Sequence, residues 1–220
     1  MFDGVAARYD VVNTLLSLGL DRHWRGAVVR AVAAGPGDLV LDLGSGTGDL
    51  TAALAKRGPR VAGVDASRGM MAAARARHSG LNELILGSAF RLPFRDACFD
   101  AAASAFVLRN LDDLPAAFAE LARVLRPGGR LAMADITEPA SPLIRRMFDA
   151  YFGVAAPALG SLAGRGDDYR YLVRSVAHLP PATDLCADLR RAGFGSARAR
   201  RLTGGIVTLF TATRNRSGEG

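Results

Sequence analysis

Apolar positions along this chain follow two alternating periods, one typical of buried strands and one typical of helices. The run LVLDLG at residues 39–44 predicts a strand that is covered on both faces, and a helical pattern follows it at residues 48–58. The alternation continues to the C-terminal run GGIVTLFTAT and predicts an α/β fold, an open and mostly parallel sheet with helices on both faces. Further strands are predicted at residues 60–67, 82–89, 98–108, 130–136, 196–202 and 204–213, with helices at 67–78, from 113 up to the Pro-Gly-Gly at 127–129, and at 184–192.

Two regions depart from this alternation. Residues 1–35 show helical spacing and end at the chain-breaking sequence GPGD, which predicts an N-terminal helical cap. Residues 138–180 are helical in pattern and rich in aromatic side chains, without strand alternation, which predicts a helical lid insert. A length of 220 residues fits one domain, so we expect residues 1–220 to share a single core.

Composition narrows the choice of partners. The formal charge is +7 and the pI is about 10.4, but the basic residues are almost all arginines scattered along the chain, so we expect no nucleic-acid partner. The N-terminal residues lack the layout of a secretory signal, and no apolar run approaches the length of a membrane span. Two distant cysteines and three unrelated histidines predict a reducing, cytoplasmic location and no metal site.

The stretch LVLDLGSGTGDLT carries the first chemical signal. The predicted strand runs directly into Gly44, Gly46 and Gly48, and glycines there allow the backbone to approach a ligand closely. Asp65 ends the next strand, where a carboxylate accepts hydrogen bonds from a ribose diol. A dinucleotide site is the rival interpretation, but its glycines are spaced G-x-G-x-x-G, and a pyrophosphate would not favour Asp42 just upstream.

The unit strand-LDLGSGTG-helix, together with Asp65, resembles the cofactor loop of class I S-adenosylmethionine (SAM) methyltransferases. The resemblance implies a Rossmann-like fold and SAM as the cofactor. Asp42 would then lie near the cationic methionine end of SAM, or would order the glycine loop by accepting hydrogen bonds from its backbone. Thr47 would contact the ligand or cap the following helix. Ser88 and the backbone of Ala89, in the loop after the third strand, would face the adenine ring.

Further motifs resemble the ubiquinone/menaquinone-biosynthesis C-methyltransferase family over nearly the whole chain, from about Phe2 to Arg214. They are ARYDVVNTLLSLGLDRHWR, FVLRNLDDLPAAFAELARVLRPGGRL, DDYRYLVRSV and AGFGSARARRLTGGIVTLFTA, in this order. The resemblance implies a seven-stranded sheet whose last strand is antiparallel, and C-methylation of a polyprenylated quinol, foremost demethylmenaquinol to menaquinol. It implies cofactor contacts at Thr47, Asp65, Ser88, Ala89 and Ala105, and substrate contacts at Tyr9, Arg109 and Asn110. The chain departs from the family's usual residues at Asp21 (His), Ser88 (Asn), Ala105 (Ser) and Asp135 (Glu).

The substrate-side residues suggest how a quinol ring would be activated. A ring carbon becomes nucleophilic once a neighbouring hydroxyl loses its proton. Arg109 is too basic to accept that proton, with a pKa above ~12, so we expect it to stabilise the phenolate or to order a water. Asn110 would orient the ring oxygen, and Tyr9 would bond the quinol or close the cleft. The alternatives are purely structural roles: a salt bridge from Arg109 to Asp112 or Asp113, and packing of Tyr9 in the core.

The predicted insert at 138–180 bears on the partner. Its aromatic and apolar side chains would line a path for a prenyl tail, and Arg145 and Arg146 beside Met147 and Phe148 suggest peripheral contact with a membrane surface. Ordinary packing of the insert on the core is the alternative. Other functions that we considered are methylation of another small apolar acceptor, SAM sensing without catalysis, and nucleic-acid methylation. The last predicts an Asn/Asp-Pro-Pro-aromatic segment where this chain has FVLRNL. The oligomeric state stays open, a homodimer included.

Overall fold

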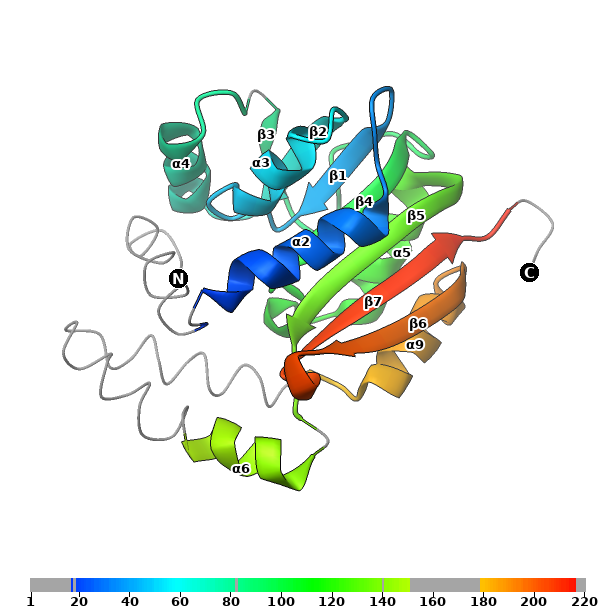
Figure 1. Cartoon of the computed structure of the whole chain (residues 1–220). Coiled ribbons are helices and arrows are strands. Elements are labelled where there is room, and N and C mark those ends of the chain that lie inside the picture. The colour runs from blue at the N-terminus through cyan, green and yellow to red at the C-terminus, as the bar shows by residue number, and fades with distance from the viewer. Residues whose placement is uncertain (1–16, 18, 82, 140, 151–178, 217–220) are drawn as a thin grey trace.

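The computed structural model describes residues 17, 19–81, 83–139, 141–150 and 179–216 and contains one seven-stranded sheet (Figure 1). The strand order is β3-β2-β1-β4-β5-β7-β6. The strands are β1 Leu39–Leu43, β2 Arg60–Asp65, β3 Leu84–Leu86, β4 Phe99–Ala105, β5 Leu125–Ile136, β6 Phe194–Leu202 and β7 Val207–Arg214.

Strand direction decides where a ligand can bind. The five strands β1 to β5 are parallel, and β7 is antiparallel to both β5 and β6. The predicted seven-stranded, mostly parallel sheet with an antiparallel last strand is therefore confirmed. From β1 the chain goes to β2 and β3 on one side and then crosses back to β4 on the other side of β1, so the carboxyl ends of β1, β2 and β4 form a crevice at a switch point of the topology.

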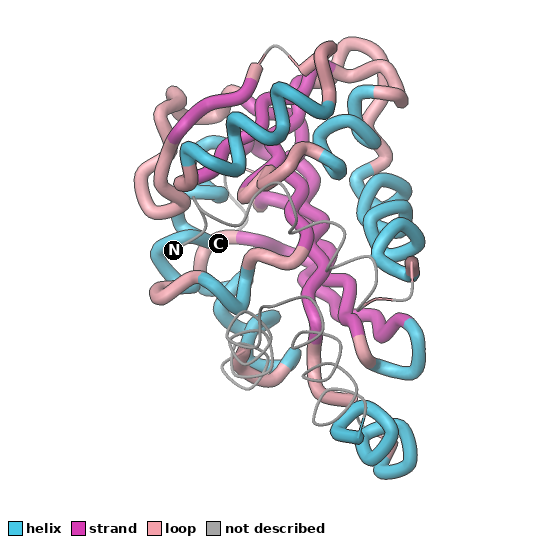
Figure 2. The backbone as a smooth tube through the Cα atoms, turned by 90° about the vertical axis from the view of Figure 1, so that its left-hand side faces the viewer, coloured by secondary structure: helices cyan, strands magenta, loops and turns pink. Residues whose placement is uncertain are grey.

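Helices cover both faces of the sheet (Figures 1 and 2). On one face, α2 and α3 pack on a core cluster that includes Trp24, Val28 and Val40, whereas α5 and α9 pack on the opposite cluster, which includes Leu41 and Phe118. Adjacent residues of β1 thus point to different cores, which explains why its sequence is apolar without alternation. The helices are α2 Leu20–Val32, α3 Asp49–Ala55, α4 Arg68–Arg77, α5 Leu114–Val124, α6 Pro142–Ala150 and α9 Ala182–Arg191, with 3-10 turns η1 Leu108–Asn110 and η3 Thr203–Gly205.

Local signals set two of the helix starts. Ser67 caps α4, because its hydroxyl accepts a hydrogen bond from the backbone N–H of Met70 at 3.2 Å. Asp113 caps α5 in the same way, accepting from Ala116 N–H at 3.0 Å, so this carboxylate serves the helix. The N-cap residue of α3 is Gly48, which has no side chain with which to cap the helix.

The predicted strand at 98–108 was wrong at its C-terminal end. Strand β4 stops at Ala105, and Phe106 takes the left-handed backbone conformation with φ +66°. Its N–H still donates to Ala134 O at 2.8 Å, but the chain then turns into η1 and buries Leu108 in the core. The apolar residues at 106–108 led to the prediction of a longer strand. A turn whose side chains pack into the core has the same apolar composition as a buried strand.

Strand β5 also differs from its prediction, because it begins at Leu125 and not at 130. It runs directly from α5 through the Pro-Gly-Gly sequence, and the pairing with β4 shifts register between Phe99 and Ala101. Much of the predicted cap at 1–35 and of the insert at 138–180 lies outside the described residues. The described parts of these regions are α2 and α6.

Candidate active site

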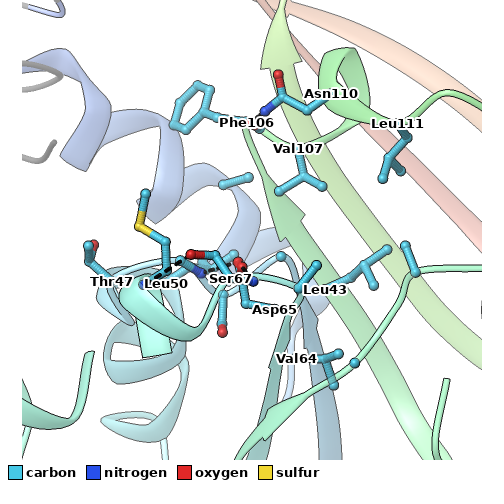
Figure 3. Close-up of a pocket in the computed structure, with 18 of the residues that line it drawn as sticks. Leu43, Thr47, Leu50, Val64, Asp65, Ser67, Phe106, Val107, Asn110 and Leu111 are labelled. Carbon is cyan, nitrogen blue, oxygen red and sulfur yellow. Dashed lines mark hydrogen bonds between the residues drawn. The ribbon is translucent and has the colours of Figure 1, made fainter. Parts of the chain in front are cut away.

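A cavity of about 380 Å³ opens at the carboxyl edge of β1, β2 and β4 (Figure 3). Its wall contains eight of the residues that the sequence singled out, and they come from four separate loops. These residues are Gly44, Gly46, Thr47, Asp65, Ser88, Ala89, Ala105 and Asn110. Tyr9 lies outside the described residues. Asp42 and Arg109 are described, but they are not among the residues that line this cavity.

The glycine loop is held tightly against the end of β4. The N–H groups of Gly44 and Ser45 both donate to Val64 O, at 2.8 and 3.0 Å, which bends the chain out of β1. Gly44 has φ +68°, and a Cβ there would lie 2.2 Å from Cγ2 of Val107. Only glycine combines a positive φ with the absence of a Cβ, so the close packing between the loop and the segment after β4 requires glycine at position 44.

Asp65 joins the loop to the end of β2. One carboxylate oxygen accepts from Gly46 N–H at 2.9 Å, and the other accepts from Ser67 N–H at 2.8 Å. Each oxygen has a second lone pair, and the residue lines the cavity, so the carboxylate can also accept hydrogen bonds from two adjacent hydroxyls. This is the geometry that a ribose diol needs.

Asp42 lies beneath the loop. It is fully buried, and it accepts a hydrogen bond from the Thr51 hydroxyl of α3 at 2.6 Å. Burial raises the pKa of this carboxyl group to about 7, against opposing effects from Thr51 and Arg25. The structure therefore agrees with the alternative that Asp42 orders the loop and α3, and it places the carboxyl behind the cavity wall.

Arg109 forms a buried ion pair with Asp135 at the end of β5. Its Nη1 lies 2.5 Å from Oδ1 of Asp135, and its backbone N–H donates to Oδ2 at 3.1 Å. The Arg109 side chain is 3% exposed and that of Asp135 is 0% exposed. The expectation that Arg109 projects into the cavity is thus not met, because the turn of η1 directs its guanidinium towards β5. Neither Asp112 nor Asp113 is the partner found; the sequence flagged Asp135 only as a departure from the family's usual residue.

Phe106 and Arg25 are among the residues of the cavity wall that sequence reasoning missed. Figure 3 shows Phe106 and Asn110 on one side of the cavity, across from Thr47 and Asp65. The guanidinium carbons of Arg25 and Arg109 lie 5.6 and 5.9 Å from the centroid of the Phe106 ring. Phe106 fell inside the strand predicted at 98–108, which hid its position at the true strand end, and nothing local marked Arg25 within its helix.

Two features are absent from the described part of the chain. No group of three or more His, Cys, Asp or Glu residues is gathered there in a way that could hold a metal ion. Among the same residues, no helix combines the length and the hydropathy that crossing a bilayer requires.

The fold and this cavity define a class of protein. A seven-stranded sheet of this order, a glycine loop after β1 and an acidic residue at the end of β2 are those of a class I SAM-dependent methyltransferase. The model of the ubiE/COQ5 methyltransferase family matches residues 1–214, and the chain belongs to that family. Its methyl donor is SAM, and the residues present fit this cofactor: Asp65 offers two acceptors for the ribose, and the positive-φ glycine loop allows close approach.

Curated relatives match nearly the whole chain. The demethylmenaquinone methyltransferase of Mycolicibacterium vanbaalenii is 44% identical over 97% of this chain and 93% of that protein. The enzymes of the same name from Mycobacterium marinum and Clavibacter sepedonicus are 45% and 43% identical, over 95% and 97% of this chain and 90% and 89% of their own lengths.

Solved structures agree on the fold. A SAM-dependent methyltransferase from Aquifex aeolicus aligns with a TM-score of 0.63 at 19% identity, over 88% of this chain and 91% of that one. A SAM-dependent methyltransferase from Thermotoga maritima aligns with a TM-score of 0.67 at 21% identity, over 97% of this chain and 98% of that one.

Proposed function

We propose that this methyltransferase converts demethylmenaquinol to menaquinol by methylating a ring carbon. The relatives of that name support the substrate, since their identity of 43–45% extends over almost the full chain. The observation that carries the proposal is the pairing of Phe106 and Asn110 in one wall of the cofactor cavity. An aromatic face and a carboxamide, side by side, suit a planar ring that bears a hydroxyl group.

The reaction needs an electron-rich ring carbon next to the methyl donor. Bound SAM supplies an electrophilic methyl group on a sulfonium centre. Loss of the quinol hydroxyl proton would move electron density to the adjacent carbon, which would take the methyl group from bound SAM and leave S-adenosylhomocysteine. The ring carbon then releases its proton and the ring regains its aromaticity. Because the carbon must lie in line with the C–S bond, holding the ring accounts for much of the rate enhancement.

Asn110 is the residue that we assign to the ring oxygen. Its side-chain amide donates to Phe106 O at 3.5 Å, which directs the carboxamide along the cavity wall. Arg109 acts one step further away, as a positioning residue: its pair with Asp135 holds η1, and η1 presents Asn110. Tyr9 keeps its proposed role on the substrate side.

A tritium or carbon-14 label in the SAM methyl group tests this proposal. We expect label to enter demethylmenaquinol, or a short-chain analogue, presented in detergent micelles. Asn110→Leu should lower kcat on the order of 10- to 100-fold while the Kd for SAM stays constant. Asn215→Leu is the matched control, because Asn215 follows β7 at the opposite edge of the sheet. Transfer to no quinol would remove the substrate, and an unchanged kcat would remove Asn110 from the site.

Peripheral membrane contact through α6 is part of the same proposal. Leu143 and Met147 lie one turn apart and are 69% and 65% exposed, and the exposed Arg145 and Arg146 lie between them. Apolar side chains flanked by arginines suit an anionic bilayer surface, where a prenylated quinol resides. The insert at 138–180 would then guide the prenyl tail from the bilayer to the cavity.

Sedimentation with vesicles tests this contact. Phosphatidylglycerol vesicles should bind the protein more than phosphatidylcholine vesicles do, and the double variant Leu143→Ser/Met147→Ser should lose most of that binding. Leu86→Ser is the control, because Leu86 is 44% exposed but lies on β3. Equal vesicle binding by all three proteins would exclude α6 as the contact.

A further inference from the structure

We propose that Arg25 binds the carboxylate of the amino-acid end of SAM, and that Asp21 holds Arg25 in position to do so. The proposal concerns the cofactor and does not depend on which acceptor is methylated. It adds a binding residue from α2, outside the loops that carry the other cofactor contacts.

The geometry of Arg25 is that of a side chain held at a cavity wall. Its Nη1 pairs with Oδ2 of Asp21, one helical turn earlier, and lies 3.9 Å from Oδ2 of Asp49. Asp21 is itself buried and accepts from the Ser17 hydroxyl at 3.1 Å, so the pair is fixed to the start of the helix. The Phe106 ring lies 5.6 Å from the guanidinium carbon and limits its motion on another side.

Both contacts with carboxylates are made by the same nitrogen, Nη1, in the described part of the chain. A guanidinium has five N–H donors in a planar fork that matches a carboxylate in two-point geometry. A side chain whose contacts with Asp21 and Asp49 use one nitrogen, and which lines a cavity, is therefore suited to receive a further carboxylate.

Charge in the cavity favours the same conclusion. Arg25 is the cationic residue among the residues that line it, whereas Asp49 and Asp65 are acidic. A carboxylate entering this cavity would be repelled by the acidic pair unless a cation faced it. The amino-acid end of SAM carries such a carboxylate.

The position of α2 indicates which end of the cofactor Arg25 meets. Asp65 ends β2 and is suited to the ribose, and Ser88 and Ala89 follow β3, where the family resemblance implies the adenine ring. Helix α2 packs on β4 and β5, on the other side of β1. A cofactor whose adenosine lies over β2 and β3 extends its amino-acid end towards α2.

Calorimetric titration of two ligands tests the assignment. The first is S-adenosylhomocysteine, and the second is its decarboxylated analogue, which keeps the amine. Arg25→Gln should raise the Kd for S-adenosylhomocysteine about 10- to 100-fold, as expected for a lost charge-assisted pair. Its Kd for the decarboxylated analogue should stay close to that of the unmodified protein. Asp21→Asn should give a smaller loss with the same ligand dependence, because it frees the guanidinium without removing it.

Arg22→Gln is the matched control, since Arg22 is exposed on the same helix, and it should change neither Kd. Thermal melting of each variant without ligand shows whether the fold persists. An equal loss of affinity for both ligands would overturn the proposal, because Arg25 would then act on the shape of the site alone. Unchanged affinity for both would also overturn it, including when turnover falls, since Arg25 would then serve the acceptor. Absence of quinol methylation would leave this test intact and would count against the proposed substrate only.

Discussion

Replacing Asp135 with asparagine should destabilise this protein severely. Oδ1 of Asp135 contacts Nη1 of Arg109 at 2.5 Å and accepts from Ile136 N–H at 2.7 Å, while Oδ2 accepts from Arg109 N–H at 3.1 Å. Every contact of this carboxylate is therefore with a donor. A carboxamide supplies one acceptor and turns its NH2 group towards one of those donors. It also leaves the Arg109 guanidinium, 3% exposed, without its negative partner.

The magnitude follows from burial. Removing one partner of a buried pair costs about 3–5 kcal/mol, because the remaining charge stays desolvated. With a urea m-value of about 2–3 kcal/mol/M, the unfolding midpoint should fall by about 1–2.5 M. Equilibrium urea unfolding, followed by both circular dichroism and tryptophan fluorescence, measures this shift and tests two-state behaviour.

Two comparisons isolate the cause. Glu83→Gln breaks the exposed pair with Arg60 and should leave the midpoint where it was, since that pair is solvated and screened. Adding Arg109→Gln to Asp135→Asn should restore part of the lost stability, because the buried charge is then gone. A loss below about 1 kcal/mol in Asp135→Asn would refute the reasoning and would mean that water or another anion reaches Arg109.

Three further outcomes are expected. Burial raises the pKa of Asp42 from 3.8 to about 7, so between these pH values the folded state holds a proton that the unfolded state releases. The free energy of unfolding should therefore fall as the pH rises from about 4 to about 7, and Asp42→Asn should remove that fall. Parallel pH profiles for the variant and the unmodified protein in urea unfolding would contradict this. Gly44→Ala should lower both the melting temperature and SAM affinity, since its Cβ would lie 2.2 Å from Val107 at φ +68°, and normal calorimetric binding would show that the loop can shift. Asp65→Ala should weaken SAM binding at least about tenfold through the lost ribose contacts and the released Gly46 N–H, whereas an unchanged Kd would remove Asp65 from the site.

The stability prediction and the binding prediction meet at the segment after β4. Val107 packs on Gly44 of the cofactor loop, Phe106 faces Arg25, and Arg109 anchors the turn to β5. Residues assigned to the acceptor thus touch residues assigned to the cofactor.

The sequence by itself determined the layers of this protein and the place of its cofactor. Periodicity distinguishes strands from helices, and the order of elements with a glycine loop after the first strand leads to a parallel sheet with a ligand at its carboxyl edge. Eight residues that the glycine loop and the family resemblance pointed to line the cavity, Asp65 and Asn110 among them. Their positions depend on short loops after strands, where chain order almost dictates location.

Only the tertiary structure decided which charged groups pair and which way they face. Arg109 and Asp135 are 26 residues apart, Arg25 reaches the cavity from a helix, and Asp42 lies under the loop it precedes. Hydrophobic periodicity indicates that a position is buried. It does not distinguish an arginine that is buried in the core, such as Arg109, from one that lines the cavity, such as Arg25, because the neighbouring residues follow the same apolar pattern. Phe106 shows the same limit: its left-handed backbone ends β4 three residues before Arg109 because the following turn packs its own apolar side chains into the core. The partner and the direction of a buried polar side chain depend on elements that meet only when the sheet assembles, because desolvation favours either an opposite charge, as at Arg109 and Asp135, or the neutral form, as at Asp42.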